Sequence, residues 1–229
     1  MSQPIASDFL EALRDSAPVM FGYIPLGMAF GVLFQSLGYH WLFAPLAGVV
    51  IYAGSAQFMA VGLLAAGVSY TEAFVATLVL NSRHIFYGLS VLSRYPKHGL
   101  SRWYLIFGLT DETYSLITAK PPESSGTTRY FVYLTGLNQS YWVLGCALGA
   151  SLQSFFAFDS AGFEFALVAL FLVLLIEQVR SMSERWLLAV ALCASGLAYV
   201  LVPNQFLLVA IGLCLATLMV RVRGGGVHG

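Results

Sequence analysis

One basic residue, Arg83, lies deep inside an apolar run, the stretch 72–92. An arginine at the centre of a membrane helix costs about 2.5 to 3.5 kcal/mol on insertion scales, and such residues normally face a cavity or an opposite charge. Asp111 and Glu112 lie at comparable depth in the short stretch 103–119. We therefore predict an ion pair between Arg83 and one of these acids. Successive helix residues diverge by about 100°, so the other acid should face a cavity or a backbone donor. An ion pair that merely holds two segments together is the alternative.

Further polar residues surround this arginine in the run LNSRHIFYG. Helical spacing places Asn81 and His84 on the face next to Arg83, so a polar wedge enters the bundle. We assign Asn81 to substrate binding and His84 to proton exchange, because an imidazole titrates near neutral pH. A neutral His84 that donates to a backbone carbonyl in the next helix explains the residue equally well. No second His or Cys stands at ligand spacing, so no metal site is predicted.

The run IYAGSAQF places Gly54 and Ser55 in the middle of the uncharged stretch 42–67, with Gln57 just beyond. A helix break at Gly54 would expose free N–H groups and the positive end of a half-helix inside the membrane. Such an end suits a carboxylate. We predict that these three residues bind the carboxylate of an amino acid.

Small and amide residues also have a structural use in membranes. Small residues let helices approach closely, as we expect for Gly27 and Gly31 in GYIPLGMAFG. That interpretation competes with substrate binding at Gly54 and Ser55. Asn138, in the segment 130–152, is also assigned to the substrate site, and interhelical hydrogen bonding is its alternative.

The composition identifies the class of protein. Of 229 residues, 59% are apolar and 10% are charged, whereas a soluble domain carries about 25% charged residues. The 56 residues between Asp15 and Glu72 contain no Asp, Glu, Lys or Arg, although about 20 apolar residues suffice to cross a bilayer. These features predict an all-α, polytopic transmembrane helical bundle. The formal charge is zero, so no nucleic-acid partner is indicated.

Apolar runs separated by breakers predict about eight membrane segments in the lipid bilayer. They lie near residues 17–37, 42–67, 72–92, 103–119, 130–152, 163–179, 186–202 and 205–222.

The charges of the loops suggest that two of these segments do not simply cross. Loops 93–102 and 119–129 are both basic, so the positive-inside rule predicts that segment 103–119 is broken or re-entrant. A cytoplasmic N-terminus then requires a break in 42–67 as well; an extracellular N-terminus with unbroken early segments is the alternative.

We expect three parts in the chain. Residues 1–16 form a short amphipathic N-terminal segment, residues 17–222 form a single transmembrane transport domain, and residues 223–229 form a flexible tail.

Four runs carry a family resemblance when taken in order: GYIPLGMAFG, IYAGSAQF, NSRHIFYGLS and FGLTDETY. Together they resemble the AzlC family, the large subunits of bacterial branched-chain amino acid exporters, over about residues 14–220. The resemblance implies export of Leu, Ile, Val and related apolar amino acids such as Met. It also implies a small four-span membrane partner of the AzlD type.

We therefore expect a multi-pass secondary transporter of a bacterial inner membrane, without a cofactor and not an enzyme. A Ser55 nucleophile with His84 as base lacks a visible oxyanion-hole motif. No P-loop occurs, so an ion gradient, with the proton as the expected ion, would drive uphill transport. Asp111 or Glu112 would receive the substrate ammonium and carry the proton when the substrate leaves. A passive channel or facilitator, and an accessory subunit of a transport complex, are the competing interpretations.

Overall fold

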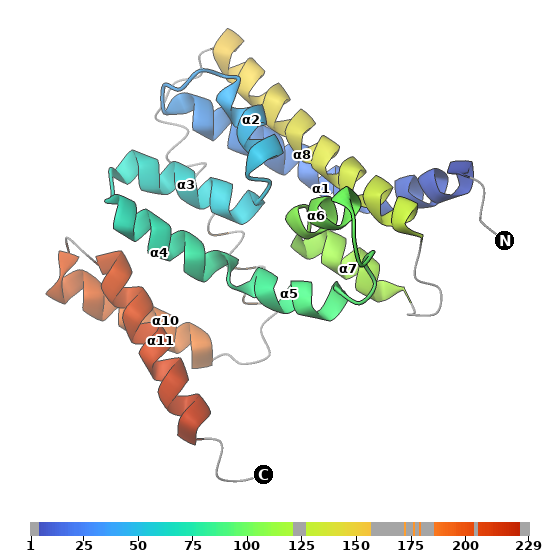
Figure 1. Cartoon of the computed structure of the whole chain (residues 1–229). Helices are drawn as coiled ribbons and strands as arrows, with labels where there is room; N and C mark the ends of the chain where they lie inside the picture. The colour runs from blue at the N-terminus through green and yellow to red at the C-terminus, as the bar shows by residue number, and fades with distance from the viewer. Residues whose placement is uncertain are drawn as a thin grey trace. The chain divides into compact units, whose positions relative to one another are not determined.

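The computed structural model describes residues 5–120, 127–156, 172, 176, 179, 186–203 and 206–224. In these residues the secondary structure is helical and contains no strand, which confirms the all-α class (Figure 1). Ser7–Ser36 is, in the described part, the one helix long and apolar enough to cross a membrane by itself. The predicted segment 163–179 lies almost wholly outside the described residues, as does most of the tail 223–229.

Two long helices, α1 (Ile5–Ser36) and α8 (Thr128–Phe156), run side by side (Figure 1). Helix α1 continues without a break across residue 16, where the sequence analysis places the end of the N-terminal segment. A Cβ atom on Gly27 would lie 2.8 Å from the backbone oxygen of Trp142, and one on Gly145 would lie 2.6 Å from that of Ile24. The expected close approach at Gly27 is therefore confirmed, because here only glycine lets the two backbones meet.

The segment 42–67 is broken, as predicted. Helix α2 (Phe43–Val50) ends before Tyr52, and α3 (Gly54–Ala66) begins at the predicted glycine. Tyr52 has a φ of 44°, a left-handed conformation that is unusual for a bulky residue. Its side chain is only 3% exposed, so the strained residue is held by its surroundings.

The segment 103–119 is broken too. Helix α6 (Leu100–Phe107) ends at Gly108, and α7 (Asp111–Ala119) begins after Thr110. Thr110 caps α7, because its Oγ1 accepts a hydrogen bond from the backbone N–H of Thr113 at 3.3 Å. This cap places two acids in the first turn of α7, where the helix dipole favours negative charge.

A third interruption lies in the stretch 72–92, which the sequence analysis treats as continuous. Helix α4 (Tyr70–Asn81) stops at Ser82, and α5 (Arg83–Val91) follows at once. Arg83 is therefore the first residue of a helix and does not lie inside one. Ser82 keeps helical dihedral angles, φ −56° and ψ −29°. The break also contains neither a glycine nor a proline, the residues that usually mark one.

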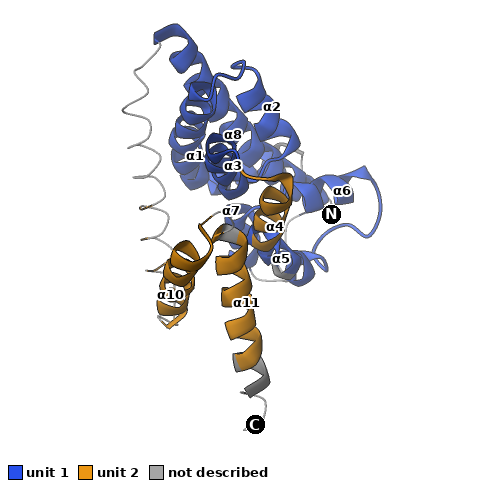
Figure 2. Cartoon of the chain, turned by 90° about the vertical axis from the view of Figure 1, so that its left-hand side faces the viewer, with its two compact units in different colours: residues 1–67, 80–160 blue, residues 68–79, 161–229 orange. Residues whose placement is uncertain are grey.

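The chain divides into two compact units (Figure 2). Residues 1–67 and 80–160 form the first unit, and residues 68–79 and 161–229 form the second. In the second unit α10 (Trp186–Leu201) and α11 (Phe206–Gly224) contact each other, and the rings of Tyr199 and Phe206 lie 6.3 Å apart. The expected single transport domain over 17–222 stays a prediction.

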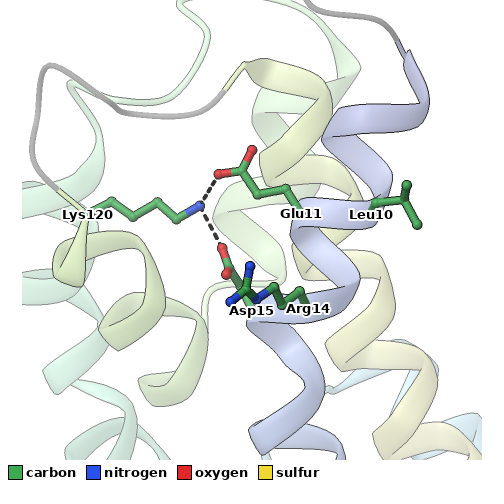
Figure 3. Close-up of a pocket in the computed structure, with 5 residues that line it drawn as sticks. All are labelled: Leu10, Glu11, Arg14, Asp15 and Lys120. Atoms are coloured by element: carbon green, nitrogen blue, oxygen red, sulfur yellow. Dashed lines mark hydrogen bonds and ion pairs between the residues drawn. The ribbon is translucent and has the colours of Figure 1, made fainter.

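Two basic residues hold the C-terminal end of α7. Nη1 of Arg94 donates to the backbone oxygens of Ile117 at 2.6 Å and Lys120 at 3.0 Å. Nζ of Lys120 lies 2.6 Å from Oε1 of Glu11 and 2.6 Å from Oδ2 of Asp15, both on α1 (Figure 3). Burial opposes the charge of Lys120, but the hydrogen bonds to Asp15 and Glu11 outweigh it and raise the pKa of Lys120.

These side chains border a hollow of about 650 Å³ that is open to the surface. Leu10, Glu11, Arg14, Asp15 and Lys120 line it (Figure 3). The two acids and two bases compensate one another, so the cluster fastens α7 to α1 without needing a further ion.

Close packing of α1 on α8 predicts that Gly145→Ala destabilises the fold. The added methyl group would meet the backbone of Ile24, which cannot move as a side-chain tip can. Overpacking of this kind costs about 1 to 3 kcal/mol. Thermal unfolding of the purified protein in detergent measures the loss. Gly22→Ala is the control, because no atom lies within 4 Å of a Cβ there; equal melting temperatures for the two variants would contradict the packing.

The ion pairs at Lys120 predict that Lys120→Met lowers the free energy of unfolding by about 1 kcal/mol, since the pairs are partly exposed. While both carboxylates are ionised, the raised pKa of Lys120 means that this contribution is complete below about pH 10, the range of an unfolded lysine, and is lost at higher pH. A thermal melt at pH 7 therefore detects it. Lys97→Met, which changes an exposed lysine, should leave the melting temperature unchanged. A Lys120→Met protein as stable as Lys97→Met would remove the fastening role.

Candidate functional site

The guanidinium group of Arg83 joins three broken segments in the first unit. Its Nη1 lies 2.7 Å from Oδ2 of Asp111, and its Nη2 donates to Oγ of Ser55 at 3.0 Å. Asp111 is the first residue of α7, and Ser55 is the second residue of α3. The arginine therefore bridges the N-terminal ends of two half-helices. Such ends carry unpaired N–H groups and partial positive charge, which favours acids and anionic ligands there.

This ion pair is half-buried. The side chains of Arg83 and Asp111 are 33% and 38% exposed, and Glu112 is exposed, so the acids are less enclosed than the sequence analysis assumes. The reason is that the acids start a short helix at a break and do not lie within a continuous span. A site of this kind is accessible to a ligand or to a proton.

The second acid faces a different partner from the first. The hydroxyl group of Tyr23 on α1 donates to Oε2 of Glu112 at 2.5 Å and lies 2.9 Å from Oγ1 of Thr110. The two acids thus diverge as expected, but Glu112 contacts a side-chain hydroxyl group where the sequence analysis expects a cavity or a backbone donor.

A line of buried polar groups continues from Thr110 to α8. Oγ1 of Thr110 lies 3.1 Å from Oγ1 of Thr113, which accepts a hydrogen bond from Nδ2 of Asn138 at 3.0 Å. Thr113 and Asn138 are fully buried. Asn138 therefore belongs to the same network as Glu112, although it lies on another helix.

The first turn of α3 packs against an aromatic cluster. Nε1 of Trp142 donates to Oε1 of Gln57 at 2.9 Å, and Gln57 is 1% exposed. A Cβ atom on Gly54 would lie 3.2 Å from the Trp142 ring, so glycine lets this indole lie close to the helix end. Phe30 and Phe58 complete the cluster, with ring centroids 6.3 and 6.2 Å from that of Trp142.

Several buried polar atoms here have no hydrogen-bond partner in the described part of the chain. Two are N–H donors, Nε2 of Gln57 and Nε of Arg83, and one is the hydroxyl group of Tyr52. Two are acceptors, Oδ1 of Asp111 and Oδ1 of Asn138. An unpaired buried polar group costs about 1 to 3 kcal/mol, so the arrangement favours a polar ligand that both donates and accepts hydrogen bonds.

Most of the sequence-predicted site residues lie in this region, and two lie apart from its contacts. The gathered residues are Gly54, Ser55, Gln57, Arg83, Asp111, Glu112 and Asn138. The imidazole Nδ1 of His84 instead lies 3.2 Å from the backbone oxygen of Asn81, a local contact. This carbonyl lies three residues earlier in the chain and does not belong to the next helix, where the alternative for His84 places its partner.

Sequence reasoning missed several residues of the network. These are Tyr23, Tyr52, Thr110, Thr113 and Trp142. Thr110 could have been found, because a threonine directly before two acids is a helix-start signal. The others carry no such signal.

Comparison with known proteins is consistent with this architecture. Residues 18–156 match the family described as AzlC protein. The branched-chain amino acid transport protein AzlC of Bacillus subtilis is 34% identical over 93% of this chain and 84% of its own length. An uncharacterized membrane protein of Helicobacter pylori is 34% identical over 93% of this chain and 96% of its own length.

A third relative is the inner membrane protein YgaZ of Escherichia coli, which is 32% identical over 77% of this chain and 76% of its own length. No solved structure matches the chain. The relatives are named as membrane or transport proteins, which supports a membrane location and points away from an enzyme. The family match and the shared length together show that the chain belongs to the AzlC family.

Proposed function

We propose that this protein is a secondary transporter that exports branched-chain and related apolar amino acids, such as Leu, Ile, Val and Met, in exchange for protons. The Bacillus subtilis relative is named for branched-chain amino acid transport, and the Escherichia coli relative is named an inner membrane protein. We accordingly propose a multi-pass location in a bacterial inner membrane. A small four-span subunit of the AzlD type is the proposed partner.

The observation that carries this proposal is a set of buried donors and acceptors without partners among the described residues of α3, α5, α7 and α8. A zwitterionic amino acid offers a carboxylate, which accepts hydrogen bonds, and an ammonium group, which donates them. Its carboxylate fits the first turn of α3 together with Nε2 of Gln57. Its ammonium group fits Oδ1 of Asp111 and Oδ1 of Asn138. One ligand would then satisfy groups that are otherwise buried without partners.

The aromatic cluster beside Gln57 supports an apolar side chain in the cargo. Phe30, Phe58 and Trp142 form a buried apolar cluster next to the proposed carboxylate site. A single methylene group changes binding in such surroundings by only about 1 to 3 kcal/mol. This limited discrimination favours a group of related substrates over a single amino acid.

Exchange follows from competition at the same acids. Among the described residues, Arg83 is the cation that pairs with Asp111. Glu112 instead contacts the neutral hydroxyl group of Tyr23. The ammonium group of the substrate and a proton are alternative positive partners for this acidic pair. A transporter that releases its substrate on one side would therefore return with a proton.

The coupling role predicts that neutralising either acid reduces pH-driven transport. We expect Asp111→Asn and Glu112→Gln each to lower leucine efflux from proteoliposomes under a pH gradient by at least tenfold. Asp8→Asn is the control, because Asp8 accepts a hydrogen bond from Thr127 away from the site, and an asparagine can still accept it. Unchanged flux in both site variants would refute coupling through these acids. A wild-type protein that never concentrates leucine under a pH gradient would be a facilitator instead.

The two-ended site predicts that cargo needs both charges. Counterflow of labelled leucine should be inhibited by unlabelled isoleucine, valine and methionine. It should be inhibited at least tenfold less well by 4-methylpentanoate, which lacks the ammonium group, and by 3-methylbutylamine, which lacks the carboxylate. Each tenfold step corresponds to about 1.4 kcal/mol of lost interaction. Equal inhibition by either analogue would contradict the zwitterion site. Repeating the assay with the small subunit present tests whether this chain binds cargo alone.

A further inference from the structure

We propose that the broken segments α2–α3 and α6–α7 are re-entrant hairpins, which enter the membrane from opposite faces and meet at their tips beside Arg83. A re-entrant segment enters and leaves the bilayer on the same face. The inference rests on the proposed multi-pass membrane location. It places the proposed amino-acid site between a hairpin that opens to the cytoplasm and one that opens to the outside. Both hairpins, and the helices α1 and α8 that they contact, belong to the first unit.

Helices α1 and α8 run in the same direction, so their residues mark the depth of the groups around them. Near their N-terminal ends Asp8 accepts a hydrogen bond from Thr127 at 2.6 Å. Further along, a Cβ atom on Gly31 would lie 2.6 Å from the backbone nitrogen of Ala150. The 32 residues of α1 measure about 48 Å, and a hydrocarbon core is about 30 Å thick. The N-terminal end of the α1–α8 pair therefore lies at one face of the membrane and its C-terminal end at the other.

Helix α2 begins at the C-terminal end of the pair and runs towards its middle. Residues 37–42 connect it to the end of α1. The backbone oxygen of Val49, in its last turn, accepts a hydrogen bond from Nε2 of Gln139 at 3.1 Å. Gln139 is the twelfth residue of the 29 in α8, so α2 has reached the middle of the pair where it ends.

Helix α3 turns back towards the end from which α2 came (Figure 1). It starts with Gly54 against the ring of Trp142. One turn later the ring of Phe58 lies 5.8 Å from that of Phe30, in the C-terminal part of α1. Eight further residues, about 12 Å of helix, bring α3 to the level at which α1 ends. The segment α2–α3 thus opens at the C-terminal end of the pair only.

The segment α6–α7 opens at the other end. Helix α7 runs against α1, because Glu112 in its first turn contacts Tyr23 while Lys120 at its end contacts Asp15. Arg94, which precedes α6, donates to the backbone oxygen of Lys120 at 3.0 Å. If the segment between these two residues crossed the membrane, they would lie about 30 Å apart. Their contact shows that the chain enters and leaves this segment at one level.

The tips of the two hairpins meet. The ring of Tyr52, between α2 and α3, lies 6.4 Å from the ring of Phe107, the last residue of α6. Immediately beyond the tips, Ser55 of α3 and Asp111 of α7 both bond to Arg83. Tyr52 is 3% exposed, so the tips form a closed contact. The arginine therefore lies where the two hairpins end.

The hairpins are also built alike. Each begins with a helix of eight residues, α2 or α6, and continues through three residues outside a helix, 51–53 or 108–110. The helices that precede the hairpins run in opposite directions. Helix α1 runs towards the C-terminal end of the pair, whereas α5 runs from Arg83 at the tips to Arg94 at the N-terminal end. A helix followed by a hairpin, present twice in opposite orientation, is an inverted repeat of the kind that builds many transporters.

Basic residues identify the face to which each hairpin opens. Arg94, Lys97 and Arg102 lie in the connection before α6 or at its start, at the N-terminal end of the pair. The connection 37–42 at the C-terminal end contains no Lys or Arg. Because cytoplasmic connections carry the excess of basic residues, the N-terminal end lies in the cytoplasm. The hairpin α6–α7 then opens to the cytoplasm, and α2–α3 opens to the outside.

Single cysteines test this arrangement. They are introduced into a protein in which the native Cys146, Cys193 and Cys214 are replaced by alanine. A membrane-impermeant maleimide is added to right-side-out or to inverted vesicles of the inner membrane. It reacts only with cysteines on the outer face of each vesicle. Labelling after detergent solubilisation confirms that each cysteine can react.

The four test positions are exposed and flank the hairpins: His98→Cys and Ala119→Cys for α6–α7, and His40→Cys and Ala66→Cys for α2–α3. We expect the first two to be labelled in inverted vesicles and to lose labelling in right-side-out vesicles. The second two should show the reverse. Lys97→Cys and Ala65→Cys, at exposed neighbouring positions, replace a variant that does not fold.

The ends of α8 supply the control for a segment that crosses. Thr128→Cys and Ser154→Cys, both exposed, should be labelled from opposite faces. Labelling of the two positions of one hairpin from opposite faces would mean that its segment crosses, and would overturn the proposal. Labelling of both hairpins from the same face would overturn it too, because the hairpins would not enter from opposite sides.

The labelling does not depend on transport, so it separates this inference from the proposed function. The expected pattern in a protein that moves no leucine would establish the hairpins and remove the transport function. Leucine transport by a protein whose α6–α7 segment crosses would retain the function and remove the hairpins.

Discussion

The need to neutralise one guanidinium group governs the rest of this structure. A continuous membrane helix satisfies its own backbone and has nothing to offer a charged neighbour. Breaks in α2–α3 and α6–α7 supply helix ends, a serine hydroxyl group and a carboxylate within reach of Arg83. The strained backbone of Tyr52 belongs to one of these breaks. Strain of this kind costs about 1 to 3 kcal/mol, and it persists where the surroundings impose it.

The broken helices contact a tightly packed pair of helices, α1 and α8. Helices α1 and α8 approach through glycines that leave no room for a methyl group. This pair fixes Tyr23 on one helix and Asn138 on the other, and the first turn of α7 bonds to both. At its other end α7 is held by Arg94 and Lys120, so this short helix is fixed at both ends.

The sequence was most informative where a charged residue lies in an apolar segment. Arg83 has very few possible partners in an uncharged bundle, and Gly54 is a conspicuous break, so both could be placed without coordinates. The break at Ser82 could not, because its dihedral angles are helical and no breaker residue marks it. The assignments of Asn81 and His84 assumed a continuous helix there. Hydroxyl groups such as that of Thr113 escape notice because membrane helices often carry them for interhelical bonds.

Two adjacent acids at the start of α7 make two different contacts, which a single acid could not make. Asp111 pairs with Arg83 and so links the ends of two broken segments. Its neighbour Glu112 contacts the neutral hydroxyl group of Tyr23 and takes no part in that ion pair. Successive residues of one helix point about 100° apart, so a single short helix provides both environments. The start of α7 therefore directs Asp111 towards Arg83 and Glu112 towards Tyr23, and the hydroxyl groups next to Glu112 continue inward to Asn138 of α8.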